Sequence, residues 1–214
     1  MKKILFLTLS AVLIAFCSPQ LLRAQAPAAP DEKQGAQQRK RTGIFTMYAF
    51  DPLARTLCLN DGKEGRMIAN NQWGNRCSDL TYSLAGNGVL VAGIEINRVA
   101  AIVDLGNAND LRERYGFEDA ENGGIGFASL RLEGDKVTIL LEDNSTPVWQ
   151  PLKEGPQLFS DVKPSANAPI KLGHIYLVRI ADTKDKRFQQ IAKLMVIAYR
   201  PNESVTLRWE LLSK

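Results

Sequence analysis

The stretch VTLRWEL, residues 205–211, decides the fold class. Its apolar residues Val, Leu, Trp and Leu alternate with the polar residues Thr, Arg and Glu. Successive side chains of a β-strand point to opposite faces of a sheet, so this alternation predicts an antiparallel strand with one buried and one polar face. Pro201 and Asn202 precede the stretch and predict a turn. The end of the chain is therefore expected to be tied into a sheet.

Further strand signals lead back from this stretch toward the amino terminus. Residues 174–181 (HIYLVRIA) and 191–199 (IAKLMVIAY) predict two strands, although residues 185–194 could begin with a helical turn. Residues 127–142 (FASLRLEGDKVTILLE) alternate on both sides of a Gly-Asp pair and predict a hairpin with a tight turn. The second half of the chain thus reads as a series of antiparallel strands.

Strand patterns also occupy the earlier part of the chain. Residues 44–50 (IFTMYAF) are β-branched and aromatic and stop at an Asp-Pro turn signal, and residues 55–61 (RTLCLND) are their expected hairpin partner. Residues 62–79 are polar and irregular. Residues 89–105 predict two strands with a reversal at positions 97 and 98, because one strand of that length would be unusual.

One segment, about 108–115, predicts a helix. Asn107 or Asn109 can cap its start, Leu111 and Tyr115 lie four residues apart, and Gly116 ends it. Turn signals elsewhere recur at roughly 8 to 12 residues, which is typical of sandwiches and barrels. The sequence therefore predicts a mainly β fold, an antiparallel β-sandwich or open barrel with this short helix and a long proline-rich loop at 144–173.

Three glycines in the four positions 123–126 (GGIG) resemble a phosphate-binding loop in composition. Such a loop leads into a helix, whose free N–H groups face the phosphate. Here the helix is expected before the glycines and a strand after them, and the acidic residues Glu118, Asp119 and Glu121 would repel an anion. We interpret the glycines as a bend or bulge that enters a strand.

The start of the chain has the layout of a secretory signal peptide. Two lysines precede an apolar run, residues 4–16, and small residues follow near Ala24 and Ala26. The run is shorter than the about 20 apolar residues that a membrane-spanning helix needs. Cleavage is expected after Ala24 or Ala26, which gives a secreted or periplasmic protein with no transmembrane segment. An uncleaved anchor is one alternative, and lipid attachment at Cys17 is another, although the bulky Phe16 departs from the lipoprotein pattern.

The expected organisation is a signal peptide (1–24), a disordered linker (25–42) and a single β-rich domain (43–214). The linker has no apolar periodicity and cannot bury enough surface to offset its ordering entropy. The full chain has a net charge of +4, of which the signal peptide carries three positive charges. The remaining charge, about +1, provides no strong field for nucleic acid.

Two of the three cysteines, Cys58 and Cys77, would remain after export. An even pair in an oxidising compartment predicts a disulfide rather than two buried free thiols. The bond would close a loop of about 20 residues and contribute about 3 kcal/mol. It would also pin the irregular segment 62–79 to the strand that carries Cys58.

Common catalytic and metal sites lack their residues in this sequence. A zinc site needs three or four ligands, and a serine triad needs a histidine base and a nucleophilic serine, for which no G-x-S-x-G motif is present. The single histidine, His174, lies at the start of a predicted strand, which favours a structural role. We therefore expect no catalytic residue, no metal and no cofactor.

Carboxylate chemistry stays open as an alternative. Glycoside hydrolysis needs only two carboxyl groups across a cleft. Glu95 and Asp104 lie in apolar strand surroundings, where burial would raise their pKa, and Asp79 lies near the expected disulfide. A structural ion pair between Glu95 and Arg98 is the simpler interpretation.

The proline-rich loop 144–173 is the expected binding surface, because long irregular loops are often functional. Trp149 and Phe159 in this loop and Trp73 in the earlier irregular segment are the candidate binding residues. The alternative is a loop that only covers a sheet edge. The predicted function is a non-catalytic binding or cell-envelope interaction module whose partner is a protein or glycan of the envelope. The alternatives are an extracytoplasmic carbohydrate hydrolase and a structural or assembly subunit.

Overall fold

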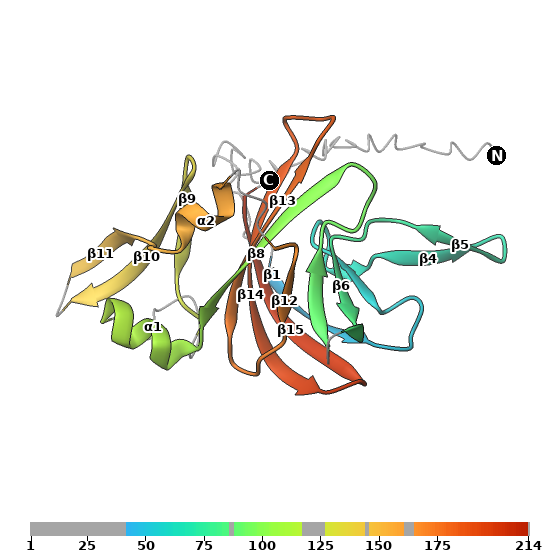
Figure 1. Ribbon diagram of the computed structural model, residues 1–214, viewed down its shortest axis with the longest axis horizontal. Helices are drawn as coiled ribbons and strands as arrows, with labels where there is room; N and C mark the ends of the chain where they lie inside the picture. The colour runs from blue at the N-terminus through green and yellow to red at the C-terminus, as the bar shows by residue number, and fades with distance from the viewer. Residues whose placement is uncertain (1–41, 86–87, 117–126, 144–145, 161–164, 214) are drawn as a thin grey trace, which may run out of the picture. The chain divides into compact units, whose positions relative to one another are not determined.

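The computed structural model describes residues 42–213 apart from 86–87, 117–126, 144–145 and 161–164. The predicted signal peptide and nearly all of the predicted linker lie outside the described residues, as does the glycine segment 123–126. Contacts group residues 39–214 into one compact unit. This unit is mainly β, with 55% strand and 9% helix, and its sheets are antiparallel (Figure 1), which confirms the predicted fold class.

A central sheet of five strands forms the middle of this unit. Its order is β1-β15-β14-β13-β8. The bounds are Thr42–Tyr48 for β1, Arg98–Gly106 for β8, Ile175–Asp182 for β13, Gln189–Arg200 for β14 and Ser204–Ser213 for β15. The predicted strands of the second half are confirmed, and β14 contains no helical turn.

The first strand corrects one prediction. β1 was expected to form a hairpin with residues 55–61, but it pairs with β15 at the other end of the chain, with Phe45 opposite Leu207. Met47 and Leu207 are both fully buried in one core. Because β15 is long and apolar on one face, it offers β1 more buried surface than the short strand that follows in sequence.

A second five-stranded sheet shares this core with the central sheet. Its order is β12-β7-β6-β2-β3, with bounds Asn167–Pro169, Val89–Ala92, Leu80–Ser83, Thr56–Cys58 and Lys63–Glu64. Leu57, Leu80 and Leu90 from this sheet and Val178 and Leu194 from the central sheet are fully buried in one cluster. The separate strands β7 and β8 confirm the predicted reversal near Asn97, whose φ is 67°.

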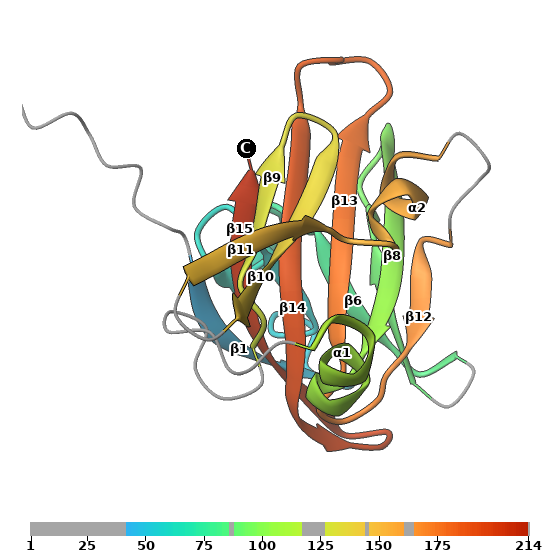
Figure 2. The same ribbon diagram turned by 90° about the vertical axis from the view of Figure 1, so that its left-hand side faces the viewer.

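A third layer covers the opposite face of the central sheet (Figure 2). It consists of a three-stranded sheet in the order β11-β10-β9, with bounds Thr146–Pro151, Lys136–Asp143 and Leu130–Glu133, and of the helices α1 (Ala108–Tyr115) and α2 (Gly155–Phe159). The predicted hairpin 127–142 is confirmed as β9 and β10. In β13, Ile175 and Leu177 face this layer, whereas Tyr176 and Val178 face the other.

The last strand, β15, was expected to have one polar, solvent-facing side, but both of its faces contain buried residues. Its apolar side chains are buried as predicted, but Glu210 on the other face is only 6% exposed. The third layer covers that face, and Glu210 pairs there with the buried Lys193 at 2.9 Å. A polar residue in an alternating strand can therefore be buried where a charge partner is supplied by the neighbouring strand.

The helical predictions are partly confirmed. Helix α1 has the predicted bounds, Asn107 caps it together with Asp110 in a capping box, and Gly116 ends it at φ 64°. The segment 144–173, expected as an irregular loop with no helix, contains β11, α2 and β12. Its prolines are compatible with these elements because Pro156 occupies the first turn of α2 and Pro169 ends the edge strand β12.

Candidate functional site

The predicted disulfide between Cys58 and Cys77 is present, with the two Cα atoms 5.2 Å apart. It joins the end of β2 to a residue 19 positions later in the chain. Between them lie β3 and a separate two-stranded sheet formed by β4 (Arg66–Ala69) and β5 (Gln72–Asn75). The bond therefore closes the loop that carries the β4–β5 hairpin.

The β4–β5 hairpin is set by its turn. Asn70 and Asn71 both have positive φ, at 53° and 59°. A two-residue hairpin turn of this kind needs left-handed backbone at both positions, and asparagine tolerates that conformation better than most residues. The side chains of Met67 and Ile68 on β4 are exposed. The hairpin is therefore held by the pairing of its two strands with each other and by the chain segments at its base, rather than by packing against a core.

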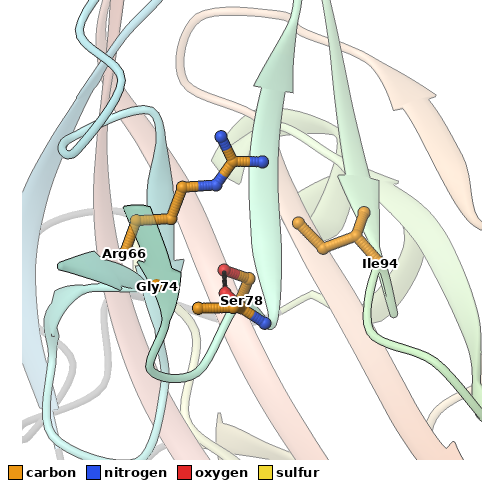
Figure 3. A pocket seen from close by; sticks show the side chains of 5 residues that line it. Arg66, Gly74, Ser78 and Ile94 are labelled. Atoms are coloured by element: carbon orange, nitrogen blue, oxygen red, sulfur yellow. Dashed lines mark hydrogen bonds between the residues drawn. The ribbon is translucent and has the colours of Figure 1, made fainter. Parts of the chain in front are cut away.

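A pocket of about 340 Å³ lies at the end of this hairpin that is nearer the disulfide. Its lining residues come from β4, β5 and the segments that follow β5 and β7: Arg66, Gly74, Asn75, Ser78 and Ile94. Figure 3 shows Arg66 and Ile94 on opposite sides, with Ser78 between them. The pocket thus combines a cation, an amide, a hydroxyl and an apolar wall.

Arg66 is the charged group of the pocket. Its side chain projects from β4 on the side of the pocket opposite Ile94 (Figure 3). Within the described part of the chain, no hydrogen bond or ion pair engages the Arg66 side chain, whereas the neighbouring Arg76 pairs with Asp61. The positive charge of Arg66 is therefore available to a ligand.

A hydrogen-bond network fixes the polar wall of the pocket. The Ser78 hydroxyl donates to the side-chain oxygen Oδ1 of Asn75, and the side-chain amide nitrogen of Asn75 donates to Glu95 at 3.3 Å. Glu95 also accepts the backbone N–H of Ser78 at 2.6 Å. Its other carboxylate oxygen lies 3.8 Å from Arg98, which confirms the expected ion pair. Glu95 thus positions Asn75 and Ser78, and its ion pair with Arg98 holds its own carboxylate in place.

Asp79 lies behind the pocket wall, against the disulfide. Its side chain is buried, and Oδ2 accepts the backbone N–H of Leu59 at 2.8 Å and lies 3.3 Å from Sγ of Cys77. Burial raises the pKa of Asp79 to about 6, while the Leu59 hydrogen bond acts in the opposite direction and the charge of Glu95 adds to the rise. Asp79 is therefore a carboxyl group that can hold a proton near neutral pH.

The two sulfurs and a carboxylate oxygen of Asp79 lie within 4.8 Å of one another. Soft metal ions bind thiolates, and sulfurs joined to each other have no thiolate to offer. In the disulfide form this cluster is therefore a disulfide with an adjacent carboxyl group and has no thiolate for a metal ion.

The prediction that burial raises the pKa of Asp104 is wrong, because the pKa of this carboxyl group is lowered. Burial acts to raise its pKa, but hydrogen bonds with His174, the backbone N–H of Gly106 and Lys171 together lower it below the ordinary value. Nδ1 of His174 lies 2.8 Å from one carboxylate oxygen, and Nζ of Lys171 lies 3.2 Å from the other. This arrangement ties the end of β8 to the start of β13, in line with the structural role expected for His174.

The three predicted binding aromatics belong to three different elements. Trp149 lies in β11, with the Arg131 guanidinium 4.2 Å from the centre of its ring. Phe159, at the end of α2, packs against the second core cluster, 5.4 Å from Arg179. Trp73 is part of β5, next to the pocket residue Gly74, but its side chain lies outside the described part of the structure. Their role in binding remains a prediction.

A second pocket, of about 190 Å³, lies between the β9–β10 turn and α2. It is lined by Asp135, Lys136, Val137, Pro151, Leu152, Gly155 and Pro156. Neither this pocket nor the first has two carboxyl groups among its described lining residues. The pair of acids that a glycoside hydrolase needs is therefore not seen at either pocket.

Comparison with known proteins found no matching family model, no matching curated protein and no matching solved structure. Among the residues that the structure describes, neither helix has the length and apolar character to cross a membrane.

Sequence reasoning missed Arg66, Asn75 and Ser78, because the segment 62–79 shows no periodicity. Two signals in this segment were available. The Asn-Asn pair at 70 and 71 is a hairpin turn signal, and the two flanking cysteines mark a closed loop. Neither signal shows that Ile94, from a different part of the chain, completes the pocket.

Proposed function

We propose that this chain is an exported, non-catalytic binding module that takes a carboxylate-bearing ligand in the pocket beside the β4–β5 hairpin. The observation that carries the proposal is the Arg66 side chain, which lines the pocket and has no ion-pair partner within the described residues. A guanidinium matches a carboxylate in shape and can bind it through two parallel hydrogen bonds.

The remaining lining residues suit a ligand of mixed character. Asn75 offers an amide that Glu95 and the Ser78 hydroxyl hold in place, and Ile94 offers an apolar surface. The volume of about 340 Å³ lies at the small end of ligand pockets. A terminal peptide carboxylate or an acidic sugar has this combination of charge, polarity and size.

Export is part of the proposal and is supported by two observations. The start of the chain has a basic, apolar and small-residue pattern typical of a signal peptide. The Cys58–Cys77 disulfide is compatible with an extracytoplasmic location, where such bonds persist. The ligand would then be a peptide or glycan of the cell envelope or its surroundings.

Binding to matched acids and neutral analogues tests the proposal. The probes are N-acetyl-Ala-Ala and its carboxyl-terminal amide, and glucuronate and glucose, titrated into the purified protein by isothermal titration calorimetry. We expect one acid of the two pairs to bind and its neutral partner to bind at least about tenfold more weakly, since a charge-assisted hydrogen bond contributes about 1.5–3 kcal/mol. The pair that responds distinguishes a peptide from a sugar ligand.

The variant Arg66→Gln should lose the same preference for the acid. Arg187→Gln is the matched control, because Arg187 is an exposed arginine on the β13–β14 turn and is not among the residues that line the pocket. Binding of neither acid, equal binding of acid and neutral analogue, or undiminished binding by Arg66→Gln would refute the proposal.

A further inference from the structure

The disulfide and the pocket are parts of one loop. Three of the five pocket residues lie between Cys58 and Cys77 in the chain, and a fourth, Ser78, follows Cys77 directly. Only Ile94 comes from elsewhere. The geometry of the pocket therefore depends on how the closed loop is anchored.

Besides the disulfide, the contacts that anchor the hairpin lie at its base, where the Gly65 N–H also donates to the Thr56 carbonyl oxygen of β2 at 3.0 Å. Among the described strands, β4 and β5 pair only with each other. All four residues of β4 are exposed. At the base of the hairpin, the backbone N–H groups of Arg76 and Cys77 donate to the Gly65 carbonyl oxygen, and Arg76 pairs with Asp61. The disulfide is the covalent link between this base and the core strand β2.

The two sulfurs differ in access. Cys58 is 2% exposed, whereas Cys77 is half-buried. A reductant therefore reaches Cys77 first. The carboxyl group beside that sulfur belongs to Asp79, at 3.3 Å. The charged groups that act on Asp79 are Glu95 and Asp61, which favour its protonated form, and Arg98, which favours its ionised form.

We propose that the Cys58–Cys77 disulfide is a reversible switch that holds the pocket in its binding shape, and that the charge state of Asp79 sets how readily a dithiol reduces it. The first part rests on the proposed function, because the switched site is the ligand pocket. The second part concerns the disulfide alone and does not depend on any ligand.

The reduction proceeds in two balanced steps. A thiolate of the dithiol attacks Sγ of Cys77 and forms a mixed disulfide, while the Cys58–Cys77 bond breaks and its electron pair leaves on Sγ of Cys58, which takes a proton. The second thiolate of the reductant then attacks the reductant sulfur of the mixed disulfide, and Sγ of Cys77 leaves with the electron pair. The reductant ends as a disulfide, and the protein has gained two electrons and two protons.

Asp79 acts on both steps through its charge. In its protonated form it carries no charge and does not repel the incoming thiolate. In its ionised form it places a negative charge beside the attacked sulfur, which repels the incoming thiolate. Reduction is therefore hindered when Asp79 is ionised.

The ratio of reduction rates between Asp79→Asn and the wild-type protein tests the role of Asp79. Both proteins are reduced with dithiothreitol at pH 5 and pH 8, and the common effect of pH on the reductant cancels in the ratio. We expect a ratio near one at pH 5 and about tenfold faster reduction of the variant at pH 8. Asp135→Asn, which removes the same charge on the β9–β10 turn, should show no such change between the two pH values. A pH-independent ratio for Asp79→Asn would overturn this part.

Hydrogen exchange tests the switch without any ligand. After reduction and alkylation of the wild-type protein, amides of β4 and β5 should lose at least about tenfold of their protection, while those of β13 and β14 keep theirs. The variant Cys58→Ser/Cys77→Ser provides the same comparison without alkylation, and either sample suffices if the other fails to fold. Unchanged protection of the hairpin would overturn the switch.

Binding separates this inference from the proposed function. If the acid probe binds the oxidised protein, reduction should weaken that binding by at least about tenfold, and equal affinity of the two forms would overturn the switch. If no acid binds the oxidised protein, the proposed function fails, and the exchange and rate measurements still decide the behaviour of the disulfide.

Discussion

The ammonium group of Lys193 lies 2.9 Å from the carboxylate of Glu210 in a place where both side chains are buried. The two residues are directly opposite each other on β14 and β15. Lys193 also donates to the carbonyl oxygen of Ala128 and lies 3.8 Å from the centre of the Phe127 ring. This ion pair therefore links the central sheet to the segment that leads into β9.

Removing one partner of this pair should be costly. The change Lys193→Met removes the ammonium group that faces the buried Glu210 carboxylate, so we expect the free energy of unfolding to fall by about 3–5 kcal/mol. The double change Lys193→Met/Glu210→Leu removes both charges, so it should lower the free energy of unfolding much less than the single change does. Urea unfolding followed by tryptophan fluorescence measures both. Equal losses in the single and double variants would contradict the coupling.

Asp79 should make stability fall as the pH rises. Its pKa in the folded protein is about 6, against an ordinary value of 3.8, so the folded state binds the proton more tightly. This contribution is fully present below pH 3.8 and is lost as the pH rises through about 6. The whole effect is about 3 kcal/mol at 1.36 kcal/mol per pKa unit.

The variant Asp79→Asn cannot ionise and should not show this loss. Its stability relative to the wild-type protein is expected to improve by about 2 kcal/mol between pH 4 and pH 7, because a small part of the effect is already lost at pH 4. Denaturant unfolding at both pH values provides the measurement, with Asp135→Asn as the control for loss of an exposed charge. A constant difference across this range would show that Asp79 does not titrate there.

Gly65 should tolerate no side chain. A Cβ atom there would collide with the backbone carbonyl of Cys77 and lie 2.7 Å from both Ser78 Oγ and Thr56 Oγ1. Gly65→Ala must displace backbone, so we expect a loss of about 1–3 kcal/mol and weaker protection of the β4–β5 amides. Gly134→Ala is a useful comparison, because its added Cβ meets no atom within 4 Å and its cost comes from a φ of 61° alone. An equal effect of both changes on the hairpin amides would contradict this account.

Substitutions of Asn107, which caps helix α1, should lower the stability of the protein by small amounts that depend on the side chain introduced. The side chain of Asn107 accepts the backbone N–H groups of Asn109 and Asp110 at 2.8 and 3.1 Å. Asn107→Ala should cost about 1 kcal/mol, while Asn107→Ser keeps an oxygen acceptor and should cost less. Thermal unfolding of the three proteins ranks them, and equal midpoints for Ala and wild type would show that the cap is dispensable.

The sequence predicted those parts of the fold that depend on local pattern. The alternation in β15, the Gly-Asp turn between β9 and β10 and the caps of α1 all act within a few residues, and each was confirmed. The disulfide was also found, because only one pairing remained once Cys17 was assigned to the leader.

The parts that were missed depend on contacts distant in the chain. Nothing in residues 44–50 shows that they will pair with β15, because the choice of partner depends on the surface that each strand can bury. Glu210 has the pattern of a solvent-facing residue, and only the third layer makes it a buried partner of Lys193. The pocket was missed for the same reason, since Ile94 and Arg66 meet only in the folded chain.

The bond between Cys58 and Cys77 also has a consequence for proteolysis. A protease that cuts the exposed β4–β5 hairpin would sever the chain between two covalently joined positions. Both fragments would stay together, and the nicked protein would run as one band on a gel until a reducing agent is added.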